Sequence, residues 1–214
     1  MTHLLELFTV FVIQLFIVVD PVAGIPVFLT ITPNKTREER HTLARRGCII
    51  GCIIIIFFLA GGHQILTYFG IQTPAVQICG GILLFVISLD LLYGRATGTE
   101  ISSREARLAE AKQDISVTPL AIPILAGPGA IATSIIFAGR TTSAVEFGVL
   151  IAGTTLVFAA TYLCLHWADY LNRVIGDLGM TILTRIMGLL IAFISVQYVI
   201  DGVRTLLACG FPSH

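Results

Sequence analysis

Long apolar runs separated by short polar connections dominate the sequence. Six runs stand out, over residues 6–30, 46–69, 73–93, 117–138, 146–170 and 182–207. Each has about the 20 residues that a helix needs to cross the hydrocarbon core of a bilayer. In lipid such segments must be helical, because every backbone polar group needs a partner within the segment. The short alternating strands of a β-barrel are missing from the pattern, which therefore predicts an all-α membrane protein with six transmembrane helices.

The composition supports this prediction. Hydrophobic residues make up 56% of the chain and charged residues only 12%, against a usual charged share of about 25%. At a mean hydropathy of +0.91, the chain lacks the polar groups that a water-solvated surface requires. The 13 basic residues are balanced by 13 acidic ones, so there is no basic field for nucleic acid and nucleic-acid binding is excluded.

The positive charges predict an orientation. All Lys and Arg residues except Arg140 and Arg204 fall on one side of the six-span topology. Because cytoplasmic loops carry an excess of Lys and Arg, this side is expected to be cytoplasmic, and both termini then lie outside the cytoplasm. Residues 95–116, the one long hydrophilic stretch, are expected to form a cytoplasmic linker.

The two halves of the sequence resemble each other when one is shifted by 107 residues. This single shift aligns two separate regions without a gap, which indicates a repeat of residues 1–94 in residues 117–214. Three spans in each half place the second half in the membrane upside down, the inverted-repeat arrangement typical of secondary transporters. The matching pairs include Pro21 and Pro128, Ala23 and Ala130, Gly81 and Gly188, and Ser88 and Ser195.

The strongest helix breakers lie at corresponding places in the first and fourth spans. The first span contains Asp-Pro-Val-Ala-Gly-Ile-Pro over 20–26, and the fourth contains Pro-Leu-Ala-Ile-Pro over 119–123 and Ala-Gly-Pro-Gly-Ala over 126–130. Proline removes a backbone donor and glycine tolerates unwound torsions. We therefore predict broken helices or re-entrant segments near the middle of the membrane. Irregular backbone at this depth is tolerated inside protein or around a polar cavity.

This arrangement suits a small zwitterion. Half-helices that begin after the breaks direct their positive ends at a carboxylate, and the freed carbonyls suit a sodium ion or an ammonium group. Asp20, the acid within the first span, is the strongest single candidate. Its expected role is to bind a cation, to carry a proton, to pair with a substrate amine, or to cap the half-helix that starts at Pro21. The candidate substrate- and ion-binding residues are Asp20, Pro21, Gly24, Pro26, Gln77, Pro123, Gly127, Pro128 and Gly129.

Two further polar residues each have two interpretations. Gln77 either lines the pathway or bonds to a neighbouring helix, and Arg185 either extends to the membrane surface or lines an inward vestibule. His63 and His166 lack ligand-like spacing, so no metal site is expected. The sequence has no nucleophile–base motif, P-loop or dinucleotide fingerprint. We therefore expect neither an enzyme nor a cofactor, and active transport would have to use an ion gradient.

The motifs at 20–28, 119–131 and 184–189 resemble the signatures of the MarC/SnatA family of bacterial and archaeal membrane proteins. The resemblance covers nearly the whole chain. It implies six spans, a prokaryotic plasma (inner) membrane, and for some members cation-driven transport of small neutral amino acids such as glycine and alanine. Many members have Asn where this chain has Asp20, so the resemblance leaves the coupling ion, Na⁺ or H⁺, open.

The sequence thus predicts a secondary transporter of small neutral amino acids, with membrane lipid and the amino acid as its partners. The alternatives are an exporter or channel for other small polar metabolites, and a membrane scaffold without transport. The sequence pattern is compatible with a homo-oligomer as well as with a monomer.

Cysteine labelling tests the predicted topology. In a variant without the native cysteines, Thr36→Cys and Gly98→Cys should react with a membrane-impermeant thiol reagent from the cytoplasmic side, and Thr142→Cys from the other side. Labelling of all three from one side would contradict the orientation.

Overall fold

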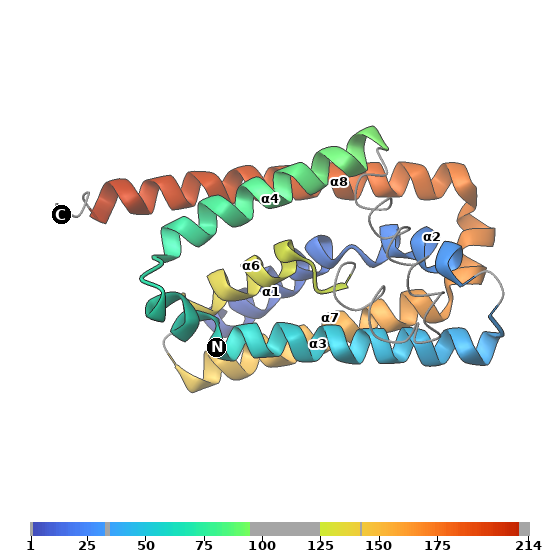
Figure 1. Cartoon of the computed structure of the whole chain (residues 1–214), viewed down its shortest axis with the longest axis horizontal. Coiled ribbons are helices and arrows are strands. Elements are labelled where there is room, and N and C mark those ends of the chain that lie inside the picture. The colour runs from blue at the N-terminus through green and yellow to red at the C-terminus, as the bar shows by residue number, and fades with distance from the viewer. Residues whose placement is uncertain (1, 33–34, 95–124, 142, 210–214) are drawn as a thin grey trace.

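The computed structural model describes residues 2–32, 35–94, 125–141 and 143–209, and helices are the only regular elements in these ranges. The helices pack in three layers (Figure 1): α4 and α8 form one, α3 and α7 the opposite one, and α1, α2 and α6 lie between them. The short helices of the broken segments therefore occupy the middle of the bundle. The helices are α1 (Thr2–Val19), α2 (Pro21–Ile31), α3 (Arg37–Tyr68), α4 (Thr73–Tyr93), α6 (Pro128–Ala138), α7 (Ala144–His166) and α8 (Ala168–Cys209).

The prediction of an all-helical, multi-span membrane protein is confirmed. Within the described ranges, five segments are long and apolar enough to cross a membrane: Thr2–Thr30, Arg37–Gly62, Thr73–Tyr93, Ala144–His166 and Leu178–Ala208. The predicted fourth span is represented by the shorter apolar helix Pro128–Ala138, while its first part (117–124) and the predicted linker (95–116) lie outside the described residues.

The first span is broken where the sequence predicts a break. Helix α1 ends at Val19, and α2 begins at Pro21. Figure 1 shows α2 continuing away from α1 in the same general direction, so this segment crosses the bundle and is not a hairpin. Helices α1 and α2 together therefore reach the length of a full membrane span.

The start of the second span differs from the sequence prediction. The second span was expected to begin at residue 46 after a polar loop, but α3 already begins at Arg37. A capping box explains the difference: the Thr36 hydroxyl accepts a hydrogen bond from the Glu39 N–H at 3.3 Å, and the Glu39 carboxylate accepts one from the Thr36 N–H at 2.8 Å. Such a cap starts a helix in polar sequence, which a hydropathy pattern does not register.

The fifth and sixth spans are also delimited differently. Helix α7 ends at His166 rather than at residue 170, and the region expected to connect it to a span beginning at 182 is already helical within α8. A kink at Gly176, whose φ of 69° lies in the left-handed region, divides α8 into a short first part and the long spanning part. Glycine adopts this conformation without a steric penalty, so the chain turns sharply between the two parts.

Helices α4 and α8 are antiparallel and approach closely through two glycines. A Cβ added at Gly81 would lie 2.7 Å from the Ser195 carbonyl oxygen. In the reciprocal position, a Cβ added at Gly188 would lie 3.2 Å from the Ser88 carbonyl oxygen. Small residues let helix backbones pack this tightly in membranes, and the contact fixes the register of the two helices.

Substitution of Gly81 should therefore destabilise the bundle. In Gly81→Ala the new methyl group meets backbone that has no free space, and we expect a loss of about 1–3 kcal/mol of stability, as for other overpacked sites. Gly148→Ala is the matched control, because no atom lies within 4 Å of a Cβ there. Thermal unfolding of the purified proteins should show a lower midpoint for Gly81→Ala only; equal midpoints would contradict the close contact.

Candidate functional site

Asp20 forms the break in the first span. Its side-chain Oδ1 accepts a hydrogen bond from the Ala23 N–H at 3.1 Å, so Asp20 caps α2. Pro21 follows at the first helical position, where its missing N–H has no intrahelical partner to lose. The N-cap interpretation is thereby confirmed. The cap has a left-handed backbone, with φ of 44°, which is uncommon for a non-glycine residue and tolerated best by Asn and Asp.

The second carboxylate oxygen of Asp20 is available for another role. Asp20 is only 7% exposed, and its Oδ2 is buried without a hydrogen-bond partner among the described residues. Burying a carboxylate oxygen without a partner is unfavourable. A sodium ion, an ammonium group or a proton on this oxygen would each remove the penalty, so capping and ligand binding are compatible at this one side chain.

The second break has the same local design. Gly127 is the N-cap of α6 and Pro128 occupies its first position. Helices α2 and α6 each contain 11 residues. The cap at Gly127 offers no side chain, so only the first break carries a carboxylate.

The two breaks lie against each other. A Cβ added at Gly129 would lie 3.2 Å from Val18 Cγ1, just before the first break, and would also collide with Leu84 of α4. From this contact α2 and α6 run in opposite directions (Figure 1). Both half-helices thus begin in the same central region, where their N-terminal partial positive charges favour an anion.

A polar bridge lies beside the breaks. The Tyr198 hydroxyl of α8 donates to Gln14 Oε1 of α1 at 2.9 Å and lies 3.4 Å from Thr133 Oγ1 of α6. Tyr198 and Thr133 are buried, at 2% and 0% exposed. The bridge joins three helices in the apolar interior, where polar groups require partners.

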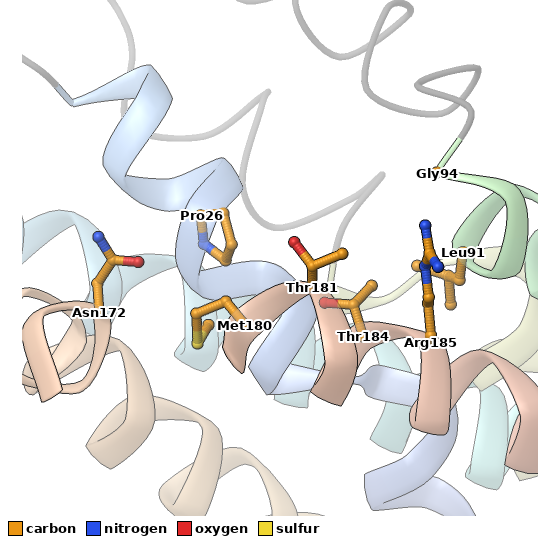
Figure 2. Close-up of a pocket in the computed structure, with 8 residues that line it drawn as sticks. All are labelled: Pro26, Leu91, Gly94, Asn172, Met180, Thr181, Thr184 and Arg185. Atoms are coloured by element: carbon orange, nitrogen blue, oxygen red, sulfur yellow. The ribbon is translucent and has the colours of Figure 1, made fainter. Parts of the chain in front are cut away.

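A cavity of about 300 Å³ opens beside α2, and Figure 2 shows its walls. Pro26 contributes from α2, Leu91 and Gly94 from the end of α4, and the remaining residues from α8. Pro26 lies about 7 Å along α2 from the first residue of that helix, so the cavity begins close to the break. The α8 residues in its wall are Asn172, Met180, Thr181, Thr184 and Arg185.

The polar side chains of this cavity suit an anionic group. They comprise an amide, two hydroxyls and one guanidinium, and none of the described lining residues is acidic. Arg185 has no ion-pair partner among the described residues. Its charge is therefore free to bind a carboxylate. Arg185 is both exposed and part of the cavity wall, so it fits the surface interpretation and the vestibule interpretation alike.

The structure brings most, but not all, of the candidate residues together. Asp20, Pro21, Gly127, Pro128 and Gly129 lie at the paired breaks, and Pro26 lines the cavity. Gly24 is buried on α2, and no described atom lies within 4 Å of a Cβ built there.

The other two candidates lie elsewhere. Gln77 packs against Gly202, about 10 Å along α4 from Leu84, and its Oε1 is buried without a partner among the described residues. It is therefore separated from the breaks. Pro123 lies outside the described residues.

Sequence reasoning missed two parts of this region. Gln14 and Tyr198 are 184 positions apart, so only the fold reveals that they meet. Gln14 does carry a signal, since it is an amide within an apolar span. Asn172, Thr181 and Thr184 carried almost none, because hydroxyl and amide residues near helix ends are common.

Comparison with known proteins gives a consistent result. Residues 5–207 match the family described as "MarC family integral membrane protein". The chain is 35% identical over 193 residues to the UPF0056 membrane protein YvbG of Bacillus subtilis, covering 90% of this chain and 92% of that protein. It is 36% identical over 191 residues to a UPF0056 membrane protein of Methanocaldococcus jannaschii, covering 89% and 93%. No solved structure matches the chain.

The dual role of Asp20 predicts different outcomes for two substitutions. Asp20→Asn keeps an acceptor for the Ala23 N–H and tolerates the left-handed backbone, so its stability should stay within about 0.5 kcal/mol of the wild type. Asp20→Ala loses the cap and should be less stable by about 1 kcal/mol or more. Thermal unfolding of both variants measures the difference; equal losses would contradict the capping geometry.

Proposed function

The chain belongs to the MarC family of integral membrane proteins, and we propose that it is a secondary transporter of small neutral amino acids of the glycine and alanine class. One observation carries the proposal: two half-helices of equal length begin after breaks 107 residues apart and start side by side within the bundle. Discontinuous helices that meet inside a membrane protein are typical of substrate and ion sites in transporters.

An inverted repeat underlies this proposal. Under the shift of 107 residues, Gly81 corresponds to Gly188 and Ser88 to Ser195. The contact of Gly81 with Ser195 therefore has as its counterpart the contact of Gly188 with Ser88, and both are present. Such reciprocity is the mark of a two-fold related interface. It supports two inverted halves that meet along α4 and α8.

Two ion pairs support alternating access. At the end of α2, Arg40 donates from Nε to the Thr32 carbonyl at 3.1 Å and from Nη1 to Asp169 at 2.8 Å. After the end of α6, Arg140 pairs with Asp201 at 3.4 Å. Because α2 and α6 run in opposite directions, these pairs lie at opposite ends of the bundle. Opening one pair while the other stays closed would expose the centre to one side at a time.

The substrate class follows from charge and size. A carboxylate suits the two helix N-termini and the Arg185 wall of the cavity, and an ammonium group suits the free oxygen of Asp20. The cavity of about 300 Å³ lies at the small end of the range for ligand pockets. A small amino acid without a charged side chain meets both requirements.

Coupling to Na⁺ or H⁺ is the accompanying proposal. A buried carboxylate oxygen without a partner is suited to either ion, and the sequence contains no nucleotide-binding motif that would supply another source of energy. The substitution Asp20→Asn distinguishes the coupling role of Asp20 from its capping role. The amide keeps the hydrogen bond to the Ala23 N–H, but it has neither a negative charge to bind Na⁺ nor a carboxyl group to carry a proton.

Uptake into proteoliposomes tests the proposal. We expect labelled glycine and alanine to accumulate in the presence of an imposed Na⁺ or H⁺ gradient. Asp20→Asn should lose at least about 90% of this gradient-driven uptake while its thermal stability stays near that of the wild type. Absence of uptake by the folded wild type would overturn the assignment of substrate. Gradient-independent equilibration of other polar solutes would favour a channel, and no flux of any solute would favour a scaffold.

Substitution of Arg185 gives a second test of the proposal, and Arg173 serves as the matched control. Arg185→Gln should raise the KM for the amino acid about tenfold, because loss of a charged hydrogen bond to a carboxylate costs about 1.5 kcal/mol or more. Arg173→Gln removes the same charge at an exposed position of α8 outside the cavity and should leave the KM unchanged. Equal effects of the two variants would remove the cavity from the substrate pathway.

A further inference from the structure

A second cavity, of about 210 Å³, lies between the first turns of α3 and the junction of α7 with α8. Arg37, Arg40 and His41 line it from α3, and His166, Trp167 and Tyr170 line it from the junction. The Arg40–Asp169 pair in its wall is one of the two ion pairs proposed for alternating access; the other side chains play no part in the proposed transport site. The cavity is smaller than the roughly 300 Å³ at which pockets for drug-sized ligands begin, so it suits a compact polar group.

The cavity lies at the ends of two candidate membrane spans. The apolar span of α7 ends at His166, and the span within α3 begins at Arg37. Trp167 and Tyr170 are 58% and 66% exposed at this level. Amphipathic aromatic side chains concentrate where lipid headgroups meet the hydrocarbon. The cavity is therefore open to the headgroup layer rather than to the hydrocarbon core.

The charges of the cavity leave one cation in excess. Asp169, the acidic residue in the wall, is paired with Arg40 at 2.8 Å, and the Nε of Arg40 is bound to the Thr32 carbonyl. Arg37 is exposed and has no ion-pair partner among the described residues. The Arg40–Asp169 pair thus holds the wall in place, and Arg37 supplies an uncompensated positive charge at the mouth.

The remaining polar groups of the cavity are mainly donors. The indole N–H of Trp167 donates only, and the Tyr170 hydroxyl and the imidazole of His41 each donate one proton. The rings of His41 and His166 contact each other with centroids 3.9 Å apart and planes inclined by 34°. The Nδ1 of His166 is buried without a partner among the described residues. Several donors around one excess cation match a phosphodiester, which has one negative charge and accepts hydrogen bonds on two free oxygens.

We propose that this cavity binds the phosphate of an anionic phospholipid headgroup from the adjoining leaflet. The lipid is favoured over a soluble phosphate because the exposed aromatic rings at the mouth lie at headgroup depth and offer apolar surface to the lipid backbone. A zwitterionic headgroup is disfavoured, since its ammonium group would meet the excess positive charge of Arg37. Basic pockets between helices at the membrane surface recognise anionic headgroups in this way. The proposal does not depend on the transport function.

Intrinsic fluorescence offers a direct test, because Trp167 is the one tryptophan of the chain and lines the cavity. Delipidated protein in neutral detergent is titrated with dihexanoyl-phosphatidylglycerol, dihexanoyl-phosphatidylcholine and inorganic phosphate. We expect phosphatidylglycerol to cause a saturable change in Trp167 emission, at concentrations at least about fivefold lower than phosphatidylcholine or inorganic phosphate. An equal response to the choline lipid would overturn the proposal, and saturation by inorganic phosphate at the same concentration would replace the lipid with a soluble anion.

Matched variants locate the binding. Arg37→Gln should weaken binding of phosphatidylglycerol about fivefold, as expected for loss of one cation near a membrane surface, and Tyr170→Phe should weaken it by removing one donor at constant charge. Arg45→Gln removes the same charge from an exposed position of the same helix outside the cavity and should bind like the wild type. Equal weakening by Arg37→Gln and Arg45→Gln would show diffuse attraction to the basic surface and overturn the site.

Discussion

The need to satisfy backbone polar groups without water governs this structure. A continuous helix meets the need by itself, but a helix broken within a bilayer leaves donors and acceptors that the protein must supply with partners. Here the break at Asp20 is closed by the residue itself: its side chain caps the Ala23 N–H, and its left-handed backbone redirects the chain. The surrounding layers of long helices bury this arrangement away from lipid, and they also enclose the second break at Gly127.

The outer layers and the middle layer have different mechanical roles. Helices α4 and α8 are held in register by backbone contacts at Gly81 and Gly188, which leave little room for sliding. Helices α2 and α6 are short and end near surface ion pairs that water can weaken. The fold thus combines a rigid frame with two short elements whose outer ends are held by contacts of modest strength.

The sequence predicted the parts of the fold that depend on local chemistry. Apolar runs revealed the spans, and the Asp-Pro and Gly-Pro-Gly motifs revealed both breaks and the cap at Asp20. It did not place the start of α3, because a capping box at Thr36 extends that helix into charged sequence. Nor did it reveal the bridge between Gln14 and Tyr198 or the α8 wall of the first cavity, since these depend on packing between distant segments. Gln77 resembles the other candidates in sequence, yet the fold places it in the second turn of α4, against Gly202.

The unequal lengths of α4 and α8 have a consequence for the surrounding bilayer. The candidate span of α8 contains 31 residues, three of them charged (Arg185, Asp201 and Arg204), and that of α4 contains 21. These lengths correspond to about 46 Å and about 31 Å of helix. A hydrocarbon core of about 30 Å fits α4 but is too thin for α8. Because the glycine contacts bind the two helices together, α8 cannot tilt to relieve this hydrophobic mismatch without carrying α4 with it. A change in lipid chain length is therefore expected to strain α4 and α8 together rather than α8 alone.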